Sequence, residues 1–567
     1  MGKESTTTAA AANRRRWIAM GVVFVATFMV LLDVTIVMVA VPSIQRQLHA
    51  TYAEVQLTVA LYLVAYAVCL IVGGRLGDLL GRRRMFMTGV AGFIVASAFC
   101  GLAPSPEALL GARLVQGITA ALMYPQALAY AQVLFPPAER NRVFAVFGAV
   151  IGVAALSGQL LGGALIQWNA FGLDWRLIFL VNIPVGLLAL VAAPLLLPES
   201  RAATRPRLDI GGLGLSAAAL LLLVWPLVEG REAGWPLWSY ISLVGVVPAF
   251  VLFVAYEHRV ARRGRAPLID VRLFHHASFS LGLLTVLALL AGIPSLVLTL
   301  TLFIQGGLGF GALHSGLTVA PFMGGFLAGS FASTRLVARF GINALVGAAI
   351  VMTVGMGLVV LGIDRAGTTL SGPELVPEML LAGVGAGAVV SQIFRVVVSA
   401  VEPHQAGAAS GVLATAQQIG SALGIAIVGV IFFGALGAGA DSVVTASSSQ
   451  LQTSLVAAGL PDTAAGTALQ QFRVCFDARA RASDPTQVPA VCPRPATGSA
   501  VADTLAAAGR TDLAVDMHRA IVIALRFNVA TWVVALALLC GFAWLHRRAH
   551  RRAPATPATA VPAPAHP

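Results

Sequence analysis

Residues 55–84 read VQLTVALYLVAYAVCLIVGGRLGDLLGRRR, and this stretch decides the class of fold. The run from Val55 to Gly74 is almost wholly apolar, and its length is the one that crosses about 30 Å of hydrocarbon as a helix. The glycine-rich turn that follows ends in three successive arginines, Arg82–Arg84. Arginine clusters of this kind stay on the cytoplasmic side of a membrane. The stretch therefore predicts a transmembrane helix whose C-terminal end faces the cytoplasm.

The whole chain repeats this pattern of apolar runs separated by short basic segments. Of its 567 residues, 58% are hydrophobic and 11% are charged, which is outside the range of soluble domains. The net charge of +13 comes from arginines clustered between the runs, a pattern that suits membrane orientation and argues against nucleic acid as a partner. Lys3 is the only lysine, so the chain has no ATP-binding P-loop. No zinc-protease helix or hydrolase elbow occurs, and we expect a membrane protein that is not an enzyme and uses no cofactor or metal.

Fourteen apolar runs are long enough to cross the bilayer. With the N-terminus inside, the arginine-rich segments fall on the cytoplasmic side, and one missed helix would invert that bias downstream. The sequence thus predicts an all-α, multi-pass protein of the cell membrane with both termini in the cytoplasm. The expected parts are a cytoplasmic tail at 1–16, an N-terminal six-helix half at 17–197, a two-helix insertion with its linkers at 198–278, a C-terminal six-helix half at 279–545 that includes an external loop at 437–519, and a disordered cytoplasmic tail at 546–567.

An internal repeat indicates how the fourteen helices are grouped. Residues 75–81 read RLGDLLG after the second helix, and residues 335–341 read RLVARFG after the tenth. A match between the second and tenth helices predicts two six-helix halves separated by an inserted pair. Duplicated halves of this kind place the substrate site between them, near the membrane midplane.

Several stretches resemble the fourteen-helix drug:proton antiporters of the major facilitator superfamily. The loop GGRLGDLLGRR at 73–83 is similar to that superfamily's motif A, and LDVTIV at 32–37 with Val41-Pro42 is similar to its first-helix signature. RLVQG at 113–117 and WRLIFLVNIPVG at 175–186 are similar to motifs of the fourth and sixth helices. The resemblance implies the major facilitator fold, transport by alternating access, and multidrug efflux that confers antibiotic resistance.

The chain departs from this family at a few positions. GQLLGG at 158–163 has glutamine where the family has proline after the first glycine. Met38, Ala414 and Gln417 stand where asparagine, asparagine and arginine are usual. Export is the direction that the resemblance implies, and the fifth-helix motif at 158–163 is the one to which that direction is tied.

Asp33 lies within the first apolar run, where an ionised carboxylate costs about 2.5–3.5 kcal/mol on insertion scales. It must therefore face a cavity, pair with a cation or bind a proton. Arg113 in the fourth helix is the candidate cation. We interpret the two as a proton-coupling pair in which Asp33 is alternately protonated and paired. A static ion pair that joins two helices is the alternative.

The resemblance implies that Asp78 and its neighbours in motif A form a latch that stabilises one access state. A carboxylate there can meet a helix N-terminus or an arginine across the interface between the halves. Gly77 permits close helix approach, and Arg82 is assigned to the same gating loop, although a role in topology alone would also explain it. Gly158 and Gly162 belong to a small-residue stripe that serves either gating or simple packing.

Neutral polar side chains are the candidates for cargo binding. A few placed amides and phenols in an apolar pocket bind drug-sized amphiphiles, and we select Tyr124, Gln126 and Gln159. Asp33 is the only acid that we place deep in a helix, so neutral or weakly amphipathic compounds are the expected cargo.

The external loop at 437–519 contains Cys475 and Cys492. An oxidising exterior favours a disulfide between them. The Ala/Ser/Thr-rich composition of this loop fits either a small folded cap or a partly disordered segment.

The predicted function is export of small hydrophobic or amphipathic molecules, such as antibiotics or drugs, driven by protons that flow inward. A proton-coupled importer or facilitator of a small metabolite would share every feature except the direction. A transport-inactive membrane sensor, whose external loop binds a partner, is the second alternative. The expected partners are the small molecule, protons and the lipid bilayer, and the expected state is a monomer.

Overall fold

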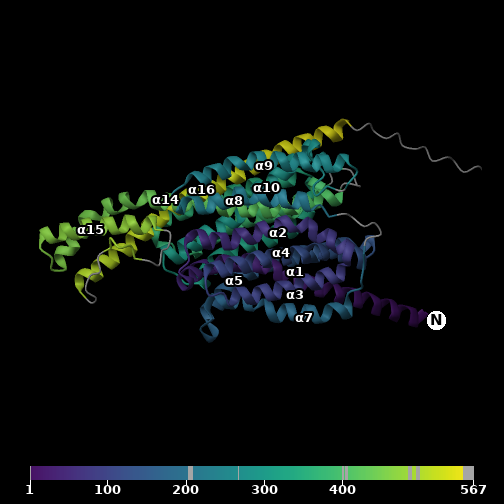
Figure 1. Ribbon diagram of the computed structural model, residues 1–567, viewed down its shortest axis with the longest axis horizontal. Helices are drawn as coiled ribbons and strands as arrows, with labels where there is room; N and C mark the ends of the chain where they lie inside the picture. The colour runs from purple at the N-terminus through teal and green to yellow at the C-terminus, as the bar shows by residue number, and fades with distance from the viewer. Residues whose placement is uncertain are drawn as a thin grey trace, which may run out of the picture.

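The computed structural model describes residues 2–201, 208–265, 267–398, 401, 406–482, 488–492 and 499–552. These residues form long helices packed side by side (Figure 1). The first part of the chain contains α1 (Gly2–Leu48), α2 (Tyr52–Leu80), α3 (Arg82–Gly101), α4 (Pro106–Leu134), α5 (Pro137–Trp168), α6 (Leu177–Leu180), α7 (Asn182–Leu196), α8 (Ile210–Glu232) and α9 (Leu237–Arg262). The second part contains α10 (Ala277–Thr301), a π-helical segment (Leu302–Gly307), α11 (Ala312–Phe340), α12 (Asn343–Ala366), α13 (Val376–Val398), α14 (Ala406–Ala457), α15 (Asp462–Arg481) and α16 (Ala500–Arg552).

Within the described residues, thirteen helical segments are long and apolar enough to cross a membrane. One of them, Asp174–Leu196, joins α6 and α7 into a single span. α4 is not among the thirteen, yet it has 29 residues and packs against α2 and α3. Its buried face carries Arg113, Gln116 and Gln126, which lower its mean hydropathy. With α4 included, the bundle has the fourteen transmembrane helices that the apolar runs predict.

The bundle consists of two groups of six spans with a helical hairpin inserted between them. We call α1–α7 the N-half, and α10–α14 with α16 the C-half. The two halves meet mainly along two helix pairs, α5 with α11 and α2 with α14, which together form the seam. The inserted α8 packs against α9, and it also contacts both α2 and α14. The hairpin therefore lies at the seam.

Local sequence signals explain where α2 begins and how closely it packs. Thr51 and Glu54 form a capping box, in which each side chain accepts a hydrogen bond from the backbone of the other. A Cβ atom at Gly73 would lie 2.1 Å from the carbonyl oxygen of Ala121 in α4. Only glycine permits this approach of two backbones, which is how small residues bring transmembrane helices together.

Two helices of the C-half continue past the membrane and build a cap. We call the end of the bundle that the arginine pattern predicts to face outward the external end. α14 continues to Ala457 and α16 begins at Ala500, so most of the external loop expected at 437–519 is helical. α15 packs against α14, and a small separate core forms there around Leu455 and Phe472. Figure 1 shows this cap, with α15 at its tip, projecting beyond one end of the bundle.

The cap also reaches the N-half. A pocket of about 470 Å³ lies between the two, lined on the cap by Ala482 and Val488–Ala490. On the N-half it is lined by His49, Glu54 and Glu107, which lie at the external ends of α1, α2 and α4. The cap, whose helices belong to the C-half, therefore faces the external end of the N-half across this pocket.

Helices also extend into both expected tails. The backbone of α1 is helical from Gly2, within the segment expected as a tail at 1–16. α16 ends at Arg552, beyond position 546, where we expected a disordered tail to begin. The remainder of that tail, 553–567, lies outside the described residues. Both extensions are continuous with transmembrane helices, so they need no new nucleation step to be helical.

Cys475 and Cys492 form a disulfide in the cap, with a sequence separation of 17 residues. Closing a loop of this size stabilises a fold by about 3 kcal/mol, because it restricts the unfolded chain. We expect the double variant Cys475→Ser/Cys492→Ser to destabilise the cap by that order while the bundle keeps its stability. Limited proteolysis of the purified protein should then cut the cap faster and the bundle at an unchanged rate. Cys540→Ser, at an exposed free cysteine, is the control, and equal cap resistance in all three proteins would contradict the expectation.

Candidate functional site

Asp33 lies inside the N-half and is fully buried. α1 presents it among apolar neighbours that include Val30 and Ile36, which are buried as well. Nη1 of Arg113 in α4 donates to Oδ2 of Asp33 over 2.5 Å, and neither side chain has exposed surface. The structure thus brings together the two residues that the sequence assigns to proton coupling. A buried ion pair of this kind persists only where its other polar atoms also find partners.

Two amides and a hydroxyl surround the carboxylate. Gln116 Nε2 and Asn182 Nδ2 donate to Asp33 Oδ1 over 2.9 and 3.1 Å. Both amides also donate to Ser97 Oγ, over 3.1 and 3.0 Å. These donors stabilise the ionised carboxylate, whereas burial favours the protonated acid. The hydrogen-bond donors and burial therefore have opposite effects on the protonation of Asp33.

Two residues of α2 contact the guanidinium group of Arg113. Its Nε donates to the Thr58 carbonyl oxygen over 3.1 Å, and the centre of its guanidinium lies 4.1 Å from the ring centroid of Tyr62. Among the described residues, Arg113 Nη2 and the Tyr62 hydroxyl are buried without a hydrogen-bond partner. Protonation of Asp33 would weaken its bond to Arg113, and the guanidinium would then depend more strongly on its contacts with α2.

A row of aromatic rings leads from Arg113 to the seam. The ring centroids of Tyr62 and Tyr66 are 6.0 Å apart, and those of Tyr66 and Tyr124 are 6.1 Å apart. The residue after Tyr66, Ala67, accepts a hydrogen bond at its carbonyl oxygen from Thr415 Oγ1 of α14 in the C-half, over 3.4 Å. Contacts between the buried ion pair and the C-half therefore run along α2.

The three side chains selected for cargo binding have different surroundings. Gln126 is buried and donates to the Gly73 carbonyl oxygen over 2.9 Å, so it joins α4 to α2 in this conformation. Gln159 donates to the Thr35 carbonyl oxygen over 3.1 Å, and its Oε1 is buried with no partner among the described residues. Tyr124 is half-buried, and its ring lies 6.1 Å from that of Tyr66 and 6.0 Å from that of Phe147 in α5. Of the three, Gln126 makes a contact typical of helix packing, and the binding roles of all three stay predictions.

The part of motif A around Asp78 is held by its own neighbour and by the segment that follows α7. Arg82 Nη2 donates to Asp78 Oδ1 over 2.9 Å, and the Arg82 backbone N–H donates to the Ser200 carbonyl oxygen over 2.9 Å. A Cβ atom at Gly77 would lie 2.1 Å from Oε1 of Gln126. The contact of Asp78 across the seam that we expected is not made between the described residues in this conformation. The arginine that pairs with Asp78 is instead Arg82, one helical turn further along the chain.

α5 lies between α1 of the N-half and α11 of the C-half, and its glycines face both helices. Cβ atoms at Gly158 and Gly162 would clash with α1, at 1.9 and 2.8 Å from the nearest atoms. A Cβ atom at Gly163 would instead lie 2.6 Å from the backbone of α11. Gly158 and Gly162 therefore pack within the N-half, and Gly163 is the glycine of that motif at the seam.

The halves are in close contact toward the external end of the seam. Gln305 of the π-helical segment donates to the Val39 carbonyl oxygen of α1 over 3.0 Å. Gln56 of α2 donates to the Ile425 carbonyl oxygen of α14 over 3.3 Å. Both bonds join the two halves near the external ends of their helices, so this conformation is closed on the external side.

We expect Gly316→Ala to push the external ends of the halves apart. A Cβ atom at Gly316 in α11 would lie 2.4 Å from the Gln159 carbonyl oxygen in α5, and overpacking of this kind costs about 1–3 kcal/mol. The balance between the two access states should therefore shift roughly fivefold or more toward external opening. Distances between spin labels on the external ends of α5 and α11 would measure the shift. Gly324→Ala, in the same helix with nothing within 4 Å, should leave the distances unchanged, and an identical distribution in Gly316→Ala would contradict the expectation.

Buried acids are more numerous than the sequence indicated. Glu257 in α9 is fully buried, and Asp209, which caps α8, is 7% exposed. Arg75 of α2 donates to the Pro267 carbonyl oxygen after α9, so the N-half also holds this end of the inserted hairpin. Asp209 could have been recognised as a helix cap directly before Ile210. The sequence did not indicate that Glu257 is buried, because this residue precedes an arginine-rich segment of the kind that is usually exposed to solvent.

The described residues do not meet the requirements of a metal site. No three His, Cys, Asp or Glu side chains in the described ranges are grouped so that they could hold a metal ion. The chemistry available at the site is the binding and release of a proton at one carboxylate beside one guanidinium.

The chain matches a protein-family model described as Major Facilitator Superfamily over residues 23–425. It is 38% identical over 543 residues to the probable actinorhodin transporter of Streptomyces coelicolor, which covers 95% of this chain and 93% of that protein. It is 36% identical over 430 residues to the puromycin resistance protein of Streptomyces alboniger, covering 75% of this chain and 83% of that protein. It is 34% identical over 435 residues to the tetracenomycin C resistance and export protein of Streptomyces glaucescens, covering 76% and 78%.

A solved structure extends the comparison to the fold. A bacterial homolog of the human lysosomal transporter Spinster, in an inward-facing and occupied conformation, is similar with a TM-score of 0.58. The match covers 93% of this chain and 97% of that one at 16% identity. At that identity the likeness concerns the arrangement of helices alone.

Proposed function

Because this chain belongs to the major facilitator superfamily, we propose that it exports small hydrophobic or amphipathic molecules, such as antibiotics or drugs, in exchange for protons. The observation that carries the proposal is the fully buried pair of Asp33 and Arg113 within one half of the bundle. Export is supported by relatives of similar length whose names state transport, resistance or export. A carboxylate kept out of water beside a guanidinium is what a reversible proton carrier requires.

The coupling that we infer runs through α2. Protonation of Asp33 removes half of the ion pair, and Arg113 then rests on its contacts to the Thr58 backbone and the Tyr62 ring. Tyr66 lies one turn further along α2, and the next residue, Ala67, accepts a hydrogen bond from Thr415 of the C-half over 3.4 Å. A change in how Arg113 holds α2 is thereby transmitted to the α2–α14 part of the seam. The two halves would then exchange an externally closed arrangement for an externally open one.

The cargo is expected to carry little fixed charge. The buried ion pair neutralises itself and is sealed within the N-half, so it offers no counter-charge to a bound molecule. Tyr66, Tyr124 and Gln418 supply aromatic faces and neutral hydrogen-bonding groups near the seam. Such a lining suits apolar or amphipathic compounds with a few polar groups.

The proposed setting is the cell membrane, with both termini in the cytoplasm and a single chain as the transport unit. The arginine distribution supports this orientation. Both six-helix halves are present in one chain, and the proposed proton site lies between helices of the N-half alone. The partners in this proposal are small molecules, protons and lipid, with no nucleic acid.

Flux in everted membrane vesicles tests the proposal. With a vesicle interior more acidic than the medium, an exporter takes candidate antibiotics up into the everted vesicles and releases protons. An importer would instead accumulate its solute in right-side-out vesicles placed in an acidic medium. A sensor would move no solute in either preparation, and either of those two results would refute proton-coupled export.

We expect Thr415→Val to weaken coupling without disturbing the buried ion pair. Thr415 Oγ1 of α14 donates to the Ala67 carbonyl oxygen of α2 across the seam over 3.4 Å. Loss of one hydrogen bond costs about 1 kcal/mol, which is roughly a fivefold change in the equilibrium between access states, and cargo accumulation at a fixed proton gradient should fall by about that factor. Thr353→Val is the matched control, because the Thr353 hydroxyl donates within α12, to the Ala349 carbonyl oxygen over 2.8 Å. Equal accumulation by the two variants would contradict a coupling role for Thr415.

A further inference from the structure

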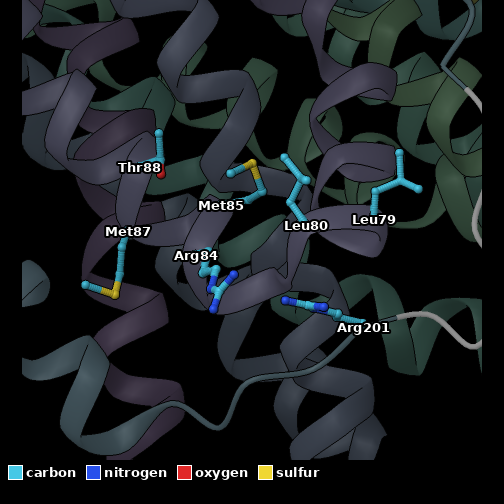
Figure 2. Close-up of a pocket in the computed structure, with 7 residues that line it drawn as sticks. All are labelled: Leu79, Leu80, Arg84, Met85, Met87, Thr88 and Arg201. Carbon is cyan, nitrogen blue, oxygen red and sulfur yellow. The ribbon is translucent and has the colours of Figure 1, made fainter.

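A second pocket lies at the opposite end of the bundle from the cap, where α2 ends and α3 begins. It has a volume of about 840 Å³ (Figure 2). Leu79 and Leu80 from the end of α2 and Met85 and Met87 from the start of α3 supply its apolar wall. The remaining lining comes from Arg84 and Thr88 of α3 and from Arg201, which follows α7. Figure 2 shows the guanidinium groups of Arg84 and Arg201 on the same side of this wall, although they come from distant parts of the chain.

The rim of this pocket carries more positive than negative charge. Arg82 is paired with Asp78, while Arg83 and Arg84 share the single carboxylate of Glu199 at 3.9 and 3.7 Å. Arg201 adds a fourth guanidinium. Within the described part of the chain, four arginines thus stand against two carboxylates here. The side chain of Arg84 is also 67% exposed, so it remains open to a further anion.

The pocket continues into a surface that faces lipid. Thr88 follows Arg84 by one helical turn, and Val95 and Phe99 follow on the same face of α3 at helical spacing. Val95 and Phe99 are 55% and 64% exposed, as expected for side chains that contact acyl chains. A molecule with an anionic head at Arg84 could therefore extend its apolar part directly down this face.

We propose that this pocket binds the headgroup of an anionic phospholipid from the adjacent leaflet, with the phosphate between Arg84 and Arg201 and an acyl chain along α3. Basic pockets at the cytoplasmic ends of transmembrane helices attract such headgroups. The apolar wall and the lipid-facing stripe distinguish this ligand from a soluble anion, which would use the guanidinium groups alone. A bound lipid would bridge the motif A loop to the segment that leads from α7 into the inserted hairpin.

Native mass spectrometry of the purified full-length protein tests the proposal. Phosphatidylglycerol and phosphatidylcholine with identical acyl chains are added in competition, and the wild type should retain phosphatidylglycerol preferentially. The double variant Arg84→Gln/Arg201→Gln should reduce that retention roughly thirtyfold, given the attraction contributed by each arginine near an anionic headgroup. Arg335→Gln/Arg339→Gln is the matched control, because these exposed arginines occupy the last two turns of α11, in the segment that repeats motif A. This control should retain the lipid as the wild type does.

Three results would overturn the proposal. The first is equal retention of the two lipids by the wild type, and the second is full retention of phosphatidylglycerol by the double variant. The third is displacement of the lipid by millimolar inorganic phosphate, which would show a soluble-anion site without an acyl-chain component. If the double variant does not fold, Arg201→Gln alone serves instead, because Arg201 is exposed and lies outside the helices. Its retention of phosphatidylglycerol should then fall by roughly the square root of the double variant's effect, about fivefold.

Discussion

Replacing Asp33 by asparagine abolishes proton-driven accumulation of cargo and leaves energy-independent exchange of cargo in place. An amide keeps the shape of the side chain and an acceptor for Gln116 and Asn182, which donate to Asp33 over 2.9 and 3.1 Å. It cannot, however, bind and release a proton. One charge that moves through 100 mV releases about 2.3 kcal/mol, so coupled export of a neutral solute supports a gradient of roughly fiftyfold per 100 mV. In the variant this ratio should fall to one.

Proteoliposomes with an imposed proton gradient provide the measurement. Net accumulation reports coupling, and counterflow of labelled cargo reports that the seam still opens and closes. Asp364→Asn, at an exposed aspartate near the end of α12, should behave as the wild type does. Uphill accumulation by Asp33→Asn would sink the proposed mechanism. Loss of counterflow as well would show that the carboxylate is needed for the motion itself.

The second large effect concerns stability. Arg113→Gln leaves the Asp33 carboxylate buried without its cation, and breaking one side of a buried ion pair costs about 3–5 kcal/mol. The double variant Asp33→Asn/Arg113→Gln should recover most of that loss, because neither partner then carries a charge. The stability of Asp33→Asn, Arg113→Gln and the double variant is measured by thermal unfolding of the purified proteins in detergent, followed by light scattering or size-exclusion chromatography.

An exposed ion pair serves as the control for this cycle. Arg481 Nε lies 2.8 Å from Asp477 Oδ1 in the cap, with 62% of the arginine side chain exposed. Removing it with Arg481→Gln should cost no more than about 1 kcal/mol. Strictly additive losses for Asp33→Asn and Arg113→Gln would mean that the two side chains do not depend on each other, contrary to the geometry.

The sequence predicts the bundle well because each span is long and apolar enough to be recognised alone. The extent of the helices is less predictable, since α14 and α16 continue into the cap through Ala/Ser/Thr-rich segments without the hydropathy of a span. In these segments continuity with the spanning helices and the separate core around Leu455 and Phe472 decide the structure. Neither contribution is visible as an apolar run.

In the candidate site, too, some features could be predicted from the sequence and others could not. Asp33 and Arg113 could be found from the sequence because a charge within an apolar run has a large cost. The amides around them could not, since an amide in a membrane helix reads equally as a ligand to a neighbouring side chain or as packing. Gln116 proves to contact Asp33, whereas Gln126 bonds to the backbone of α2. Only the three-dimensional arrangement separates the two cases.

The length of α14 has a consequence for observing this protein at work. Its 52 residues extend about 78 Å, more than twice the thickness of the hydrocarbon layer. A small tilt of the C-half would therefore produce a larger displacement at the tip of α15, because displacement grows with distance from the axis of rotation. Because Ala482 and Val488–Ala490 line one side of the pocket at the external end of the N-half, that pocket must widen whenever the two halves part on this side. Two dyes attached across this junction would report single turnovers from outside living cells, without touching the path of the cargo.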